Sequence, residues 1–412
     1  MGDSQLSAVV AIRRGQMGRP LKRALAGGTI AFLVLIAYGC AAPRSQFTTL
    51  DQRAARALAA RMDQTRRNEL QQDLRAAFAT RAPRNILVLS GGGASGAFGC
   101  GVLNGWRGAQ GGRPTFDVVT GVSTGALMAT FAFLGEPRDD AVLREVYTRT
   151  RDADVHDGPF TFGPPDSVFD TGPLERLIAR HVTAETIDRV AAAHREGRRL
   201  YVATVDLDAG AVVIWPLSKL AAERGRGYRE RFRQILLAAA SIPVFFPPVR
   251  IDGDLHVDAG LREAVFLREA MLGLARAYDG LPAGSRGAGP PAVWAIVNDK
   301  LEMAPQAVGD DLPEIGFRSL TLFTQSLTFL NVREVAHVAA AHDPPFIFRY
   351  ISIPPDIQAD TSPSVFEPVF DPRRMQRLYA IGAARGSRSD VWSQGPPPPD
   401  DDPDAVAVKL TP

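Results

Sequence analysis

Short apolar segments alternate with longer helical segments between residues 85 and 390. The apolar segments are rich in β-branched residues and have the length of buried strands, whereas the segments between them repeat apolar residues at helical spacing. Because helices that connect parallel strands cover both faces of a sheet, this alternation predicts a three-layer α/β/α domain with a mainly parallel central sheet. We expect strands at 86–89, 116–119, 200–205, 212–215, 293–297 and 346–353, and helices at 124–134, 139–150, 173–182, 184–196, 228–240, 263–277, 314–341 and 372–385.

The composition is that of an ordinary globular protein. Of 412 residues, 45% are hydrophobic and 22% are charged, and the formal net charge is +2, so bulk charge does not suggest a nucleic-acid partner. The excess of positive charge lies in residues 1–39, which contain five basic residues and one acidic residue, Asp3. The rest of the chain contains 42 basic and 44 acidic residues. With two cysteines, Cys40 and Cys100, the chain is not a disulfide scaffold.

The N-terminal segment has the pattern of an export signal. A basic stretch ends at Arg23, an apolar run follows over 24–37, and small residues precede Cys40. The run is shorter than the roughly 20 apolar residues of a spanning helix. Its last four residues resemble a bacterial lipobox, so we expect 1–39 to be a signal peptide and Cys40 to be lipidated. An uncleaved anchor, a plain secretory signal and a start at Met17 stay open as alternatives.

This signal predicts an exported protein, held at a membrane of the bacterial cell envelope by a lipid or by an uncleaved anchor. Two flanking segments differ in composition from the α/β region. Residues 41–84 are polar and rich in Ala, Arg and Gln, and we expect a helical lead-in or stalk there. Residues 393–412 hold a four-proline run and an Asp cluster, and we expect a disordered tail. The functional domain is therefore expected at 85–390.

A serine motif follows the second predicted strand. Residues 121–125 read G-x-S-x-G around Ser123, and a helix of small and apolar residues follows. A serine at such a strand–turn–helix has a strained backbone and an exposed hydroxyl. Gly121 and Gly125 allow the strand and the helix to approach closely. We therefore predict Ser123 to be a nucleophile.

A glycine-rich loop follows the first predicted strand. Gly91, Gly92 and Gly93 leave their backbone N–H groups uncovered, and Gly96 completes the glycine pattern. Such amides stabilise an oxyanion, and the loss of one donor costs about 3 kcal/mol. The loop also fits the dinucleotide-binding pattern G-x-G-x-x-G, but the acidic residue near the required distance, Asp117, begins its strand where that fold needs it at the end.

A serine nucleophile needs a group that accepts its proton. Asp258 ends a short strand and precedes Ala259 and Gly260, and a carboxylate there could contact the serine directly as base and then as acid. Of the six histidines, only His256 lies near a turn of this kind. A histidine-dependent α/β-hydrolase esterase is thus the alternative, although its usual order places the histidine after the acid.

Taken together, these segments resemble the patatin-like phospholipases. The order is the same: a G-G-G-x-x-G oxyanion loop at 91–96, G-x-S-x-G at 121–125, and Asp-[Gly/Ala]-[Gly/Ala] at 258–260. Residues 239–248 are similar to the family's A-S-x-x-P-x-x-F-P-P segment, and residues 167–174 to its S-x-x-D-x-x-P-L segment. The resemblance extends over about 85–300.

The resemblance implies a lipid acyl hydrolase, of phospholipase A or lysophospholipase type, that uses a Ser123–Asp258 dyad and an acyl-enzyme. It implies a phospholipid or other fatty-acyl ester as substrate, contact with a membrane surface, and neither cofactor nor metal. Ser95 stands where the family often has Arg or Lys, and Ala259 where Gly is commoner. These departures leave a second function open: a catalytically silent member of the fold that binds lipid or protein.

Overall fold

The computed structural model describes residues 52–157, 167–265, 268–287, 289–303, 305, 308–357 and 368–398, all within one compact unit. The predicted signal peptide at 1–39, the lipidation site Cys40 and the tail from 399 onward lie outside the described residues. None of the described helices combines the length and apolar character that crossing a bilayer requires.

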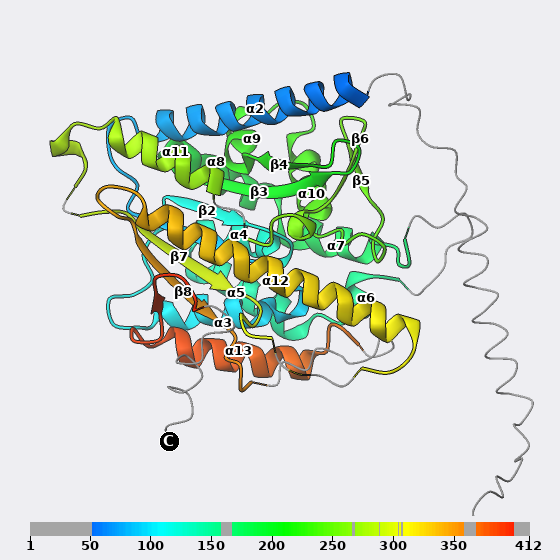
Figure 1. The fold of residues 1–412 in the computed structure, drawn as a ribbon. Coiled ribbons are helices and arrows are strands. Elements are labelled where there is room, and N and C mark those ends of the chain that lie inside the picture. Colours follow the sequence, from blue (N-terminus) through cyan, green and yellow to red (C-terminus); the bar gives the residue numbers. More distant parts are fainter. Residues whose placement is uncertain are drawn as a thin grey trace, which may run out of the picture. The chain divides into compact units, whose positions relative to one another are not determined.

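The core of the domain is a nine-stranded mixed sheet (Figure 1), in the order β5-β6-β3-β2-β1-β7-β8-β9, with β4 paired to β3. The five strands β1, β2, β3, β7 and β8 run parallel, and the others are antiparallel to their neighbours. The sheet is therefore mainly parallel, as predicted. The strands are β1 Asn85–Leu89, β2 Val118–Gly121, β3 Arg199–Asp206, β4 Ala211–Trp215, β5 Val249–Ile251, β6 Asp254–Asp258, β7 Ala292–Val297, β8 Ile347–Ser352 and β9 Ser393–Gln394.

Helices cover both faces of this sheet, which confirms the three-layer α/β/α prediction (Figure 1). Side chains of β1 alternate between the two apolar clusters that result: Leu87 and Leu89 belong to one, Ile86 and Val88 to the other. Both faces of a parallel strand are thus buried, which explains why these strands read as continuous apolar runs.

The two helical layers differ in size. The larger contains α3 Gly96–Arg107, α4 Thr124–Leu134, α5 Pro137–Arg149, α6 Asp152–Val155, α7 Gly172–His181, α8 Ala184–Arg195, α9 Leu217–Glu223, α10 Tyr228–Ala239 and α13 Pro372–Gly386. The other contains α2 Gln52–Ala77, α11 Arg268–Asp279 and α12 Leu312–Ala340.

The ends of the described chain pack on the domain. In the segment predicted as a helical lead-in, α2 contributes Leu70 and Leu74 to the core, and Phe78 follows them. In the segment predicted as a tail from 393, Ser393 and Gln394 pair with β8. The folded region therefore includes residues on both sides of the stretch 85–390.

The helix expected at 263–277 begins five residues later, at Arg268. After Asp258 the chain forms a 3-10 turn, η3 Ala259–Leu261, and residues 263–265 then brace the glycine loop. Ala264 accepts a hydrogen bond from the Gly91 amide, and its own amide donates to Asn331 of α12. These contacts hold residues 259–265 in a non-helical conformation, which the helical spacing of apolar residues in the sequence does not predict.

Candidate active site

Ser123 occupies a sharp turn between β2 and α4. Its backbone angles are φ 56° and ψ −129°, a conformation that is rare for residues other than glycine and typically costs about 1–3 kcal/mol. A Cβ at Gly121 would lie 2.4 Å from the Gly125 carbonyl oxygen, and a Cβ at Gly125 would lie 2.4 Å from that of Leu89. Both glycines of the motif are thus required by close backbone approach, as the sequence predicted.

Strand β3 brings Asp258 to this turn. Val202 of β3 pairs with Gly121 on one edge and with β4 on the other. Thr204 also pairs with β4, and its other partner is Asp258. Because a strand has two edges, β2 and β6 follow one another along the same edge of β3. Asp258 therefore lies just beyond the point where β2 ends and turns into Ser123.

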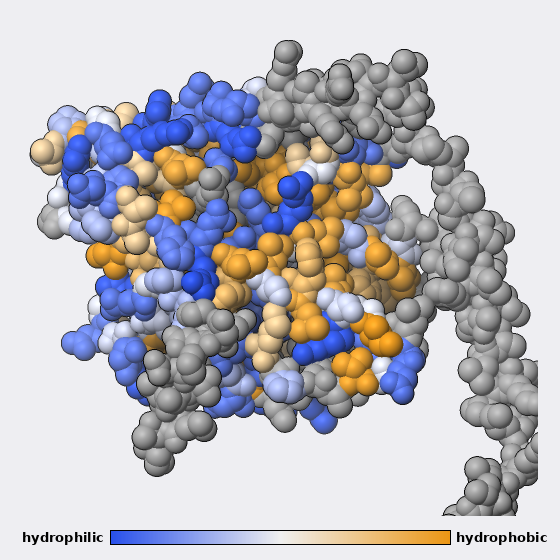
Figure 2. Space-filling model, in the orientation of Figure 1, coloured by the Kyte–Doolittle hydropathy of each residue, from blue (hydrophilic) through white to orange (hydrophobic). Residues whose placement is uncertain are grey.

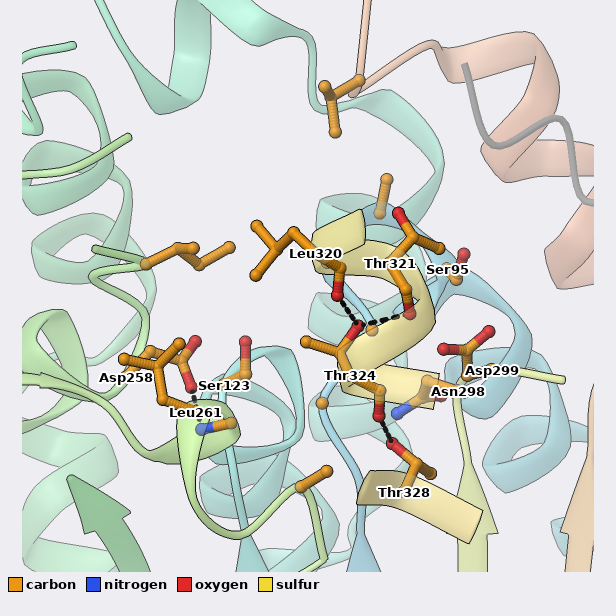
Figure 3. Close-up of a pocket in the computed structure, with 18 of the residues that line it drawn as sticks. Ser95, Ser123, Asp258, Leu261, Asn298, Asp299, Leu320, Thr321, Thr324 and Thr328 are labelled. Atoms are coloured by element: carbon orange, nitrogen blue, oxygen red, sulfur yellow. Dashed lines mark hydrogen bonds between the residues drawn. The ribbon is translucent and has the colours of Figure 1, made fainter. Parts of the chain in front are cut away.

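The Asp258 carboxyl is buried and faces the Ser123 hydroxyl (Figure 3). Its Oδ1 accepts from the Gly260 amide at 2.8 Å, and its own amide donates to the Ser241 carbonyl at 2.9 Å. The hydroxyl does not yet donate a hydrogen bond to Oδ2, which is buried and accepts none from the described residues. One carboxylate oxygen is thus held in place and the other is open toward the serine.

Burial raises the pKa of the Asp258 carboxyl to about 6, although the Ser123 hydroxyl and the Gly260 amide, both close to it, act in the opposite direction. A general base with a pKa close to the working pH is efficient, because it is largely ionised and still accepts a proton readily. The site therefore holds a carboxylate suited to take a proton from Ser123.

The glycine loop lies against the serine, but its three predicted donors are not equivalent. The Gly91 amide donates to the Ala264 carbonyl at 3.2 Å, so it is not available to an oxyanion in this structure, and the prediction for Gly91 is corrected here. The amides of Gly92 and Gly93 donate to no backbone oxygen of the described residues. Both glycines have positive φ, 143° and 53°, which turns the peptide units of the loop.

Asn298, just after β7, holds this loop in place, and no sequence motif marks it. Its Oδ1 accepts from the Gly99 amide at 3.1 Å, and its Nδ2 donates to the Ser90 carbonyl at 3.0 Å. The backbone amide of Asn298 donates to the Ser90 hydroxyl at 2.8 Å. A Cβ at Gly92 would lie 2.3 Å from the Asn298 carbonyl oxygen, so no larger residue fits. Asn298 thus connects β1, the loop and the start of α3.

Asn298→Ala is expected to lower kcat for ester hydrolysis by about 10- to 100-fold with little change in KM, because the misplacement of an oxyanion donor weakens transition-state binding more than ground-state binding. The matched control is Asn104→Ala on α3, which removes hydrogen bonds to the Asp140 carbonyl and the Tyr379 hydroxyl away from the site. If both variants lose kcat equally, and in proportion to the thermal stability that each loses, then Asn298 supports the fold but does not position the oxyanion donors.

Two alternative readings of the sequence do not fit this geometry. Asp117 accepts hydrogen bonds from the Arg84 and Asn85 amides at the start of the strands, the opposite end from the glycine loop, so it cannot hold a ribose beside that loop. His256 is buried next to Thr204, with its Nδ1 3.0 Å from the threonine hydroxyl, and it lines neither cavity beside Ser123. These positions argue against a dinucleotide site and a histidine base.

Two cavities meet at Ser123. We call them the α12 cavity, of about 270 Å³, and the α7 cavity, of about 210 Å³. Both are lined by Gly93, Ser123, Ile242, Leu320 and Val369. The α12 cavity also contains the carboxyl of Asp258 and has polar groups on its far wall, namely Asp299, Thr321, Thr324, Thr328 and Arg374. The α7 cavity is walled by apolar side chains, including Leu127, Val146, Phe169, Leu174, Leu177, Phe245, Phe246, Phe370 and Met375.

The two further segments singled out in the sequence meet in the wall of the α7 cavity. The Val168 amide donates to the Val244 carbonyl at 2.8 Å, and the Phe169 amide to the Phe245 carbonyl at 2.9 Å. These bonds place the two segments side by side, so residues far apart in the chain form one apolar wall near Ser123. In the described residues, no group of three or more His, Cys, Asp or Glu side chains is arranged to hold a metal ion.

Fold and site together define a three-layer α/β protein that presents a serine at a strand–helix turn, as serine hydrolases do. Residues 87–271 match the family model described as patatin-like phospholipase, so the chain contains a patatin-like phospholipase domain. The match runs from β1 into α11, and β7, α12 and β8 lie outside it.

No curated protein matches the sequence. Among solved structures, the crystal structure of VipD from Legionella pneumophila is similar with a TM-score of 0.38 and 11% identity, over 76% of this chain and 68% of that one.

Proposed function

We propose that the protein is a serine-dependent acyl hydrolase of lipid esters, of the phospholipase A or lysophospholipase type, with Ser123 as nucleophile and Asp258 as general base. The observation that carries this proposal is the open Oδ2 of a buried carboxyl that faces a serine hydroxyl on a strained turn. The patatin-like phospholipase domain supports a lipid substrate.

In this proposal the reaction has two stages. Asp258 takes the proton of Ser123 while the serine oxygen attacks the ester carbonyl, and the oxyanion is held by the amides of Gly92 and Gly93. The alcohol leaves with the proton from Asp258, and an acyl-enzyme remains. Asp258 then takes a proton from water, which attacks the acyl-enzyme. As the bond between the acyl carbon and the Ser123 oxygen breaks, Asp258 returns this proton to the serine oxygen and the fatty acid is released. Neither a cofactor nor a metal has a part in these steps.

The two cavities give this reaction an orientation. An acyl chain is apolar along its length and suits the α7 cavity, because burial of each CH₂ contributes about 0.8 kcal/mol. The alcohol part of the ester then lies in the α12 cavity, beside the side chain of Asp258 that protonates it. The test is release of free fatty acid from a panel of acyl esters, together with labelling by a fluorophosphonate probe. Lipid binding without either reaction would support the silent alternative.

A lipid surface is the proposed place where the enzyme meets its substrate. Apolar side chains gather on the face that α12 crosses (Figure 2). Val369 lines both cavities and is 42% exposed, and Val244 is 70% exposed between the residues that line them. Val244 also has φ 75°, which is a strained conformation for a β-branched residue. Export and a lipid on Cys40 remain part of this proposal and would hold the domain at the same surface.

Val244→Gly is expected to weaken binding to phospholipid vesicles by up to about tenfold, because one inserted valine contributes about 1.5 kcal/mol. Glycine adopts a positive φ without strain, so thermal stability should stay the same or rise. Vesicle flotation measures the binding. Leu207→Ala, which truncates another exposed side chain outside both cavities, is the control. Equal vesicle binding by both variants and the wild type would contradict an inserted Val244.

A further inference from the structure

The far wall of the α12 cavity contains a carboxylate that the proposed mechanism does not use. Asp299 follows Asn298 at the end of β7, and Figure 3 shows it with Thr321 and Thr324 across the cavity from Ser123 and Asp258. Its Oδ1 accepts from the Lys300 amide at 2.7 Å and from Gln325 Nε2 at 3.1 Å. No described residue donates to Oδ2, so that oxygen is left for a ligand.

Two hydroxyl groups in the same wall as Asp299 donate their hydrogen atoms to helix carbonyls. The Thr324 hydroxyl donates to the Leu320 and Thr321 carbonyls, and the Thr328 hydroxyl donates to the Thr324 carbonyl at 2.8 Å. Both hydroxyl oxygens can therefore only accept from a ligand. The wall thus presents a carboxylate and hydroxyl acceptors to whatever part of the substrate lies there.

Neither nearby cation is hydrogen-bonded to this carboxylate. The Lys300 ammonium donates to the Pro355 carbonyl at 2.9 Å and is not part of the cavity wall. The Arg374 guanidinium lines the cavity, but it donates to the carbonyls of Pro368 and Val369. Ser95 in the glycine loop is uncharged. Among the described residues the Asp299 carboxylate accepts only from the Lys300 amide and Gln325 and forms no ion pair, so a second negative charge placed next to this carboxylate would be repelled.

We infer that Asp299 is a specificity-determining residue of the proposed hydrolase: it favours acyl esters of a neutral, hydroxyl-bearing alcohol and disfavours esters with an anionic headgroup. The inference rests on the proposed function and narrows it: among lipid esters, acylglycerols would be better substrates than esters whose headgroup is an anionic phosphate. A hydroxyl of a glycerol-like alcohol donates to Oδ2, whereas a phosphate offers only acceptors and is repelled by the carboxylate.

The preference depends on the ionisation of Asp299. Burial raises the pKa of this carboxyl, although Gln325, the Lys300 amide and the Lys300 ammonium act in the opposite direction. The other ionisable groups that line the cavity are Asp258 and Arg374. Because of the raised pKa, Asp299 ionises at a higher pH than an ordinary carboxyl does. Discrimination against the anionic ester should therefore grow as pH rises through that pKa. The ratio of two substrates isolates this effect, since Asp258 acts in the hydrolysis of both.

The test compares kcat/KM for two monomeric short-chain esters: 1-octanoylglycerol, and 1-octanoylglycero-3-phosphomethanol, which carries one constant negative charge. The wild type at pH 8 is expected to have a kcat/KM about tenfold higher for the neutral ester. Repulsion between like charges a few ångströms apart in a half-buried site is large enough to produce a ratio of this size. Asp299→Asn should bring the two values within about threefold. The control Asp356→Asn removes an exposed carboxylate from a neighbouring turn and should keep the wild-type ratio.

The outcomes are distinct. Equal kcat/KM for both esters in the wild type, or an equal change of the ratio in both variants, overturns the inference while leaving the proposed function standing. Cleavage of neither ester and no fluorophosphonate labelling removes the proposed function, and the inference with it. Should Asp299→Asn fail to fold, the pH dependence of the wild-type ratio decides: a ratio that stays flat from pH 4, close to the ordinary carboxyl pKa, up to pH 9 overturns the inference.

Discussion

Ser123→Ala is expected to lower fatty-acid release by at least about 10⁴-fold and to abolish labelling by a fluorophosphonate probe. The nucleophilic oxygen is the one group that the reaction cannot replace, and what remains is the smaller contribution of the oxyanion amides and of substrate binding. Free fatty acid is measured by mass spectrometry, and labelling by in-gel fluorescence of protein that has first been shown to be folded.

The control for this prediction is Ser387→Ala, which removes an exposed hydroxyl after α13 and should leave both readouts unchanged. Ser123→Gly adds a test of the turn itself. We expect it to be as inactive as Ser123→Ala but more stable than Ser123→Ala by about 1 kcal/mol, because glycine relieves the positive φ of 56°. Labelling that persists in Ser123→Ala would assign the nucleophile to another residue.

The nucleophile turn was predictable from the sequence because its residues are consecutive in the chain. Gly121 is fixed by a close approach within the turn and Gly125 by the carbonyls of Leu89 and Ser90, but both glycines belong to one five-residue pattern that can be read directly. The parallel strands were predictable because burial on both faces of the sheet leaves continuous apolar runs, such as that of β1, whereas the short strands β5 and β9 were not among the expected strands.

The structure around the turn was not predictable, because it depends on contacts between distant segments. Asn298 meets Ser90 across 208 positions, and an isolated asparagine after a strand has no pattern that reports this. The engaged amide of Gly91 depends on the path of residues 259–265. Helix α3 did not appear among the expected helices, because its glycines lower helix propensity; a Cβ at Gly101 would lie 2.1 Å from the Tyr379 carbonyl oxygen of α13.

Asp258→Asn is expected to reduce kcat by about 10²- to 10⁴-fold, since an amide cannot accept the serine proton. In the wild type, activity should rise with pH through about 6, because the buried carboxyl ionises only there and the base must be ionised to act. A pH profile of kcat/KM with 1-octanoylglycerol measures this step. The residual activity of Asp258→Asn should show no such step, and Asp252→Asn, which alters an exposed carboxylate paired with Arg231, should retain it.

The same substitution should stabilise the fold at neutral pH. The folded-state pKa of Asp258 lies above the ordinary value of 3.8, at about 6, so the folded protein binds this proton more tightly than the unfolded chain does. Its contribution to stability is therefore present below about pH 4 and is lost as pH rises through about 6, a loss of up to about 3 kcal/mol. Asp258→Asn, which has no charge to bury, should unfold like the wild type at pH 4 and be more stable at pH 8, as measured by urea denaturation at both pH values. If the variant is no more stable than the wild type at pH 8, the pKa of the Asp258 carboxyl is not raised by burial, and the general base lacks the property that the proposed mechanism uses.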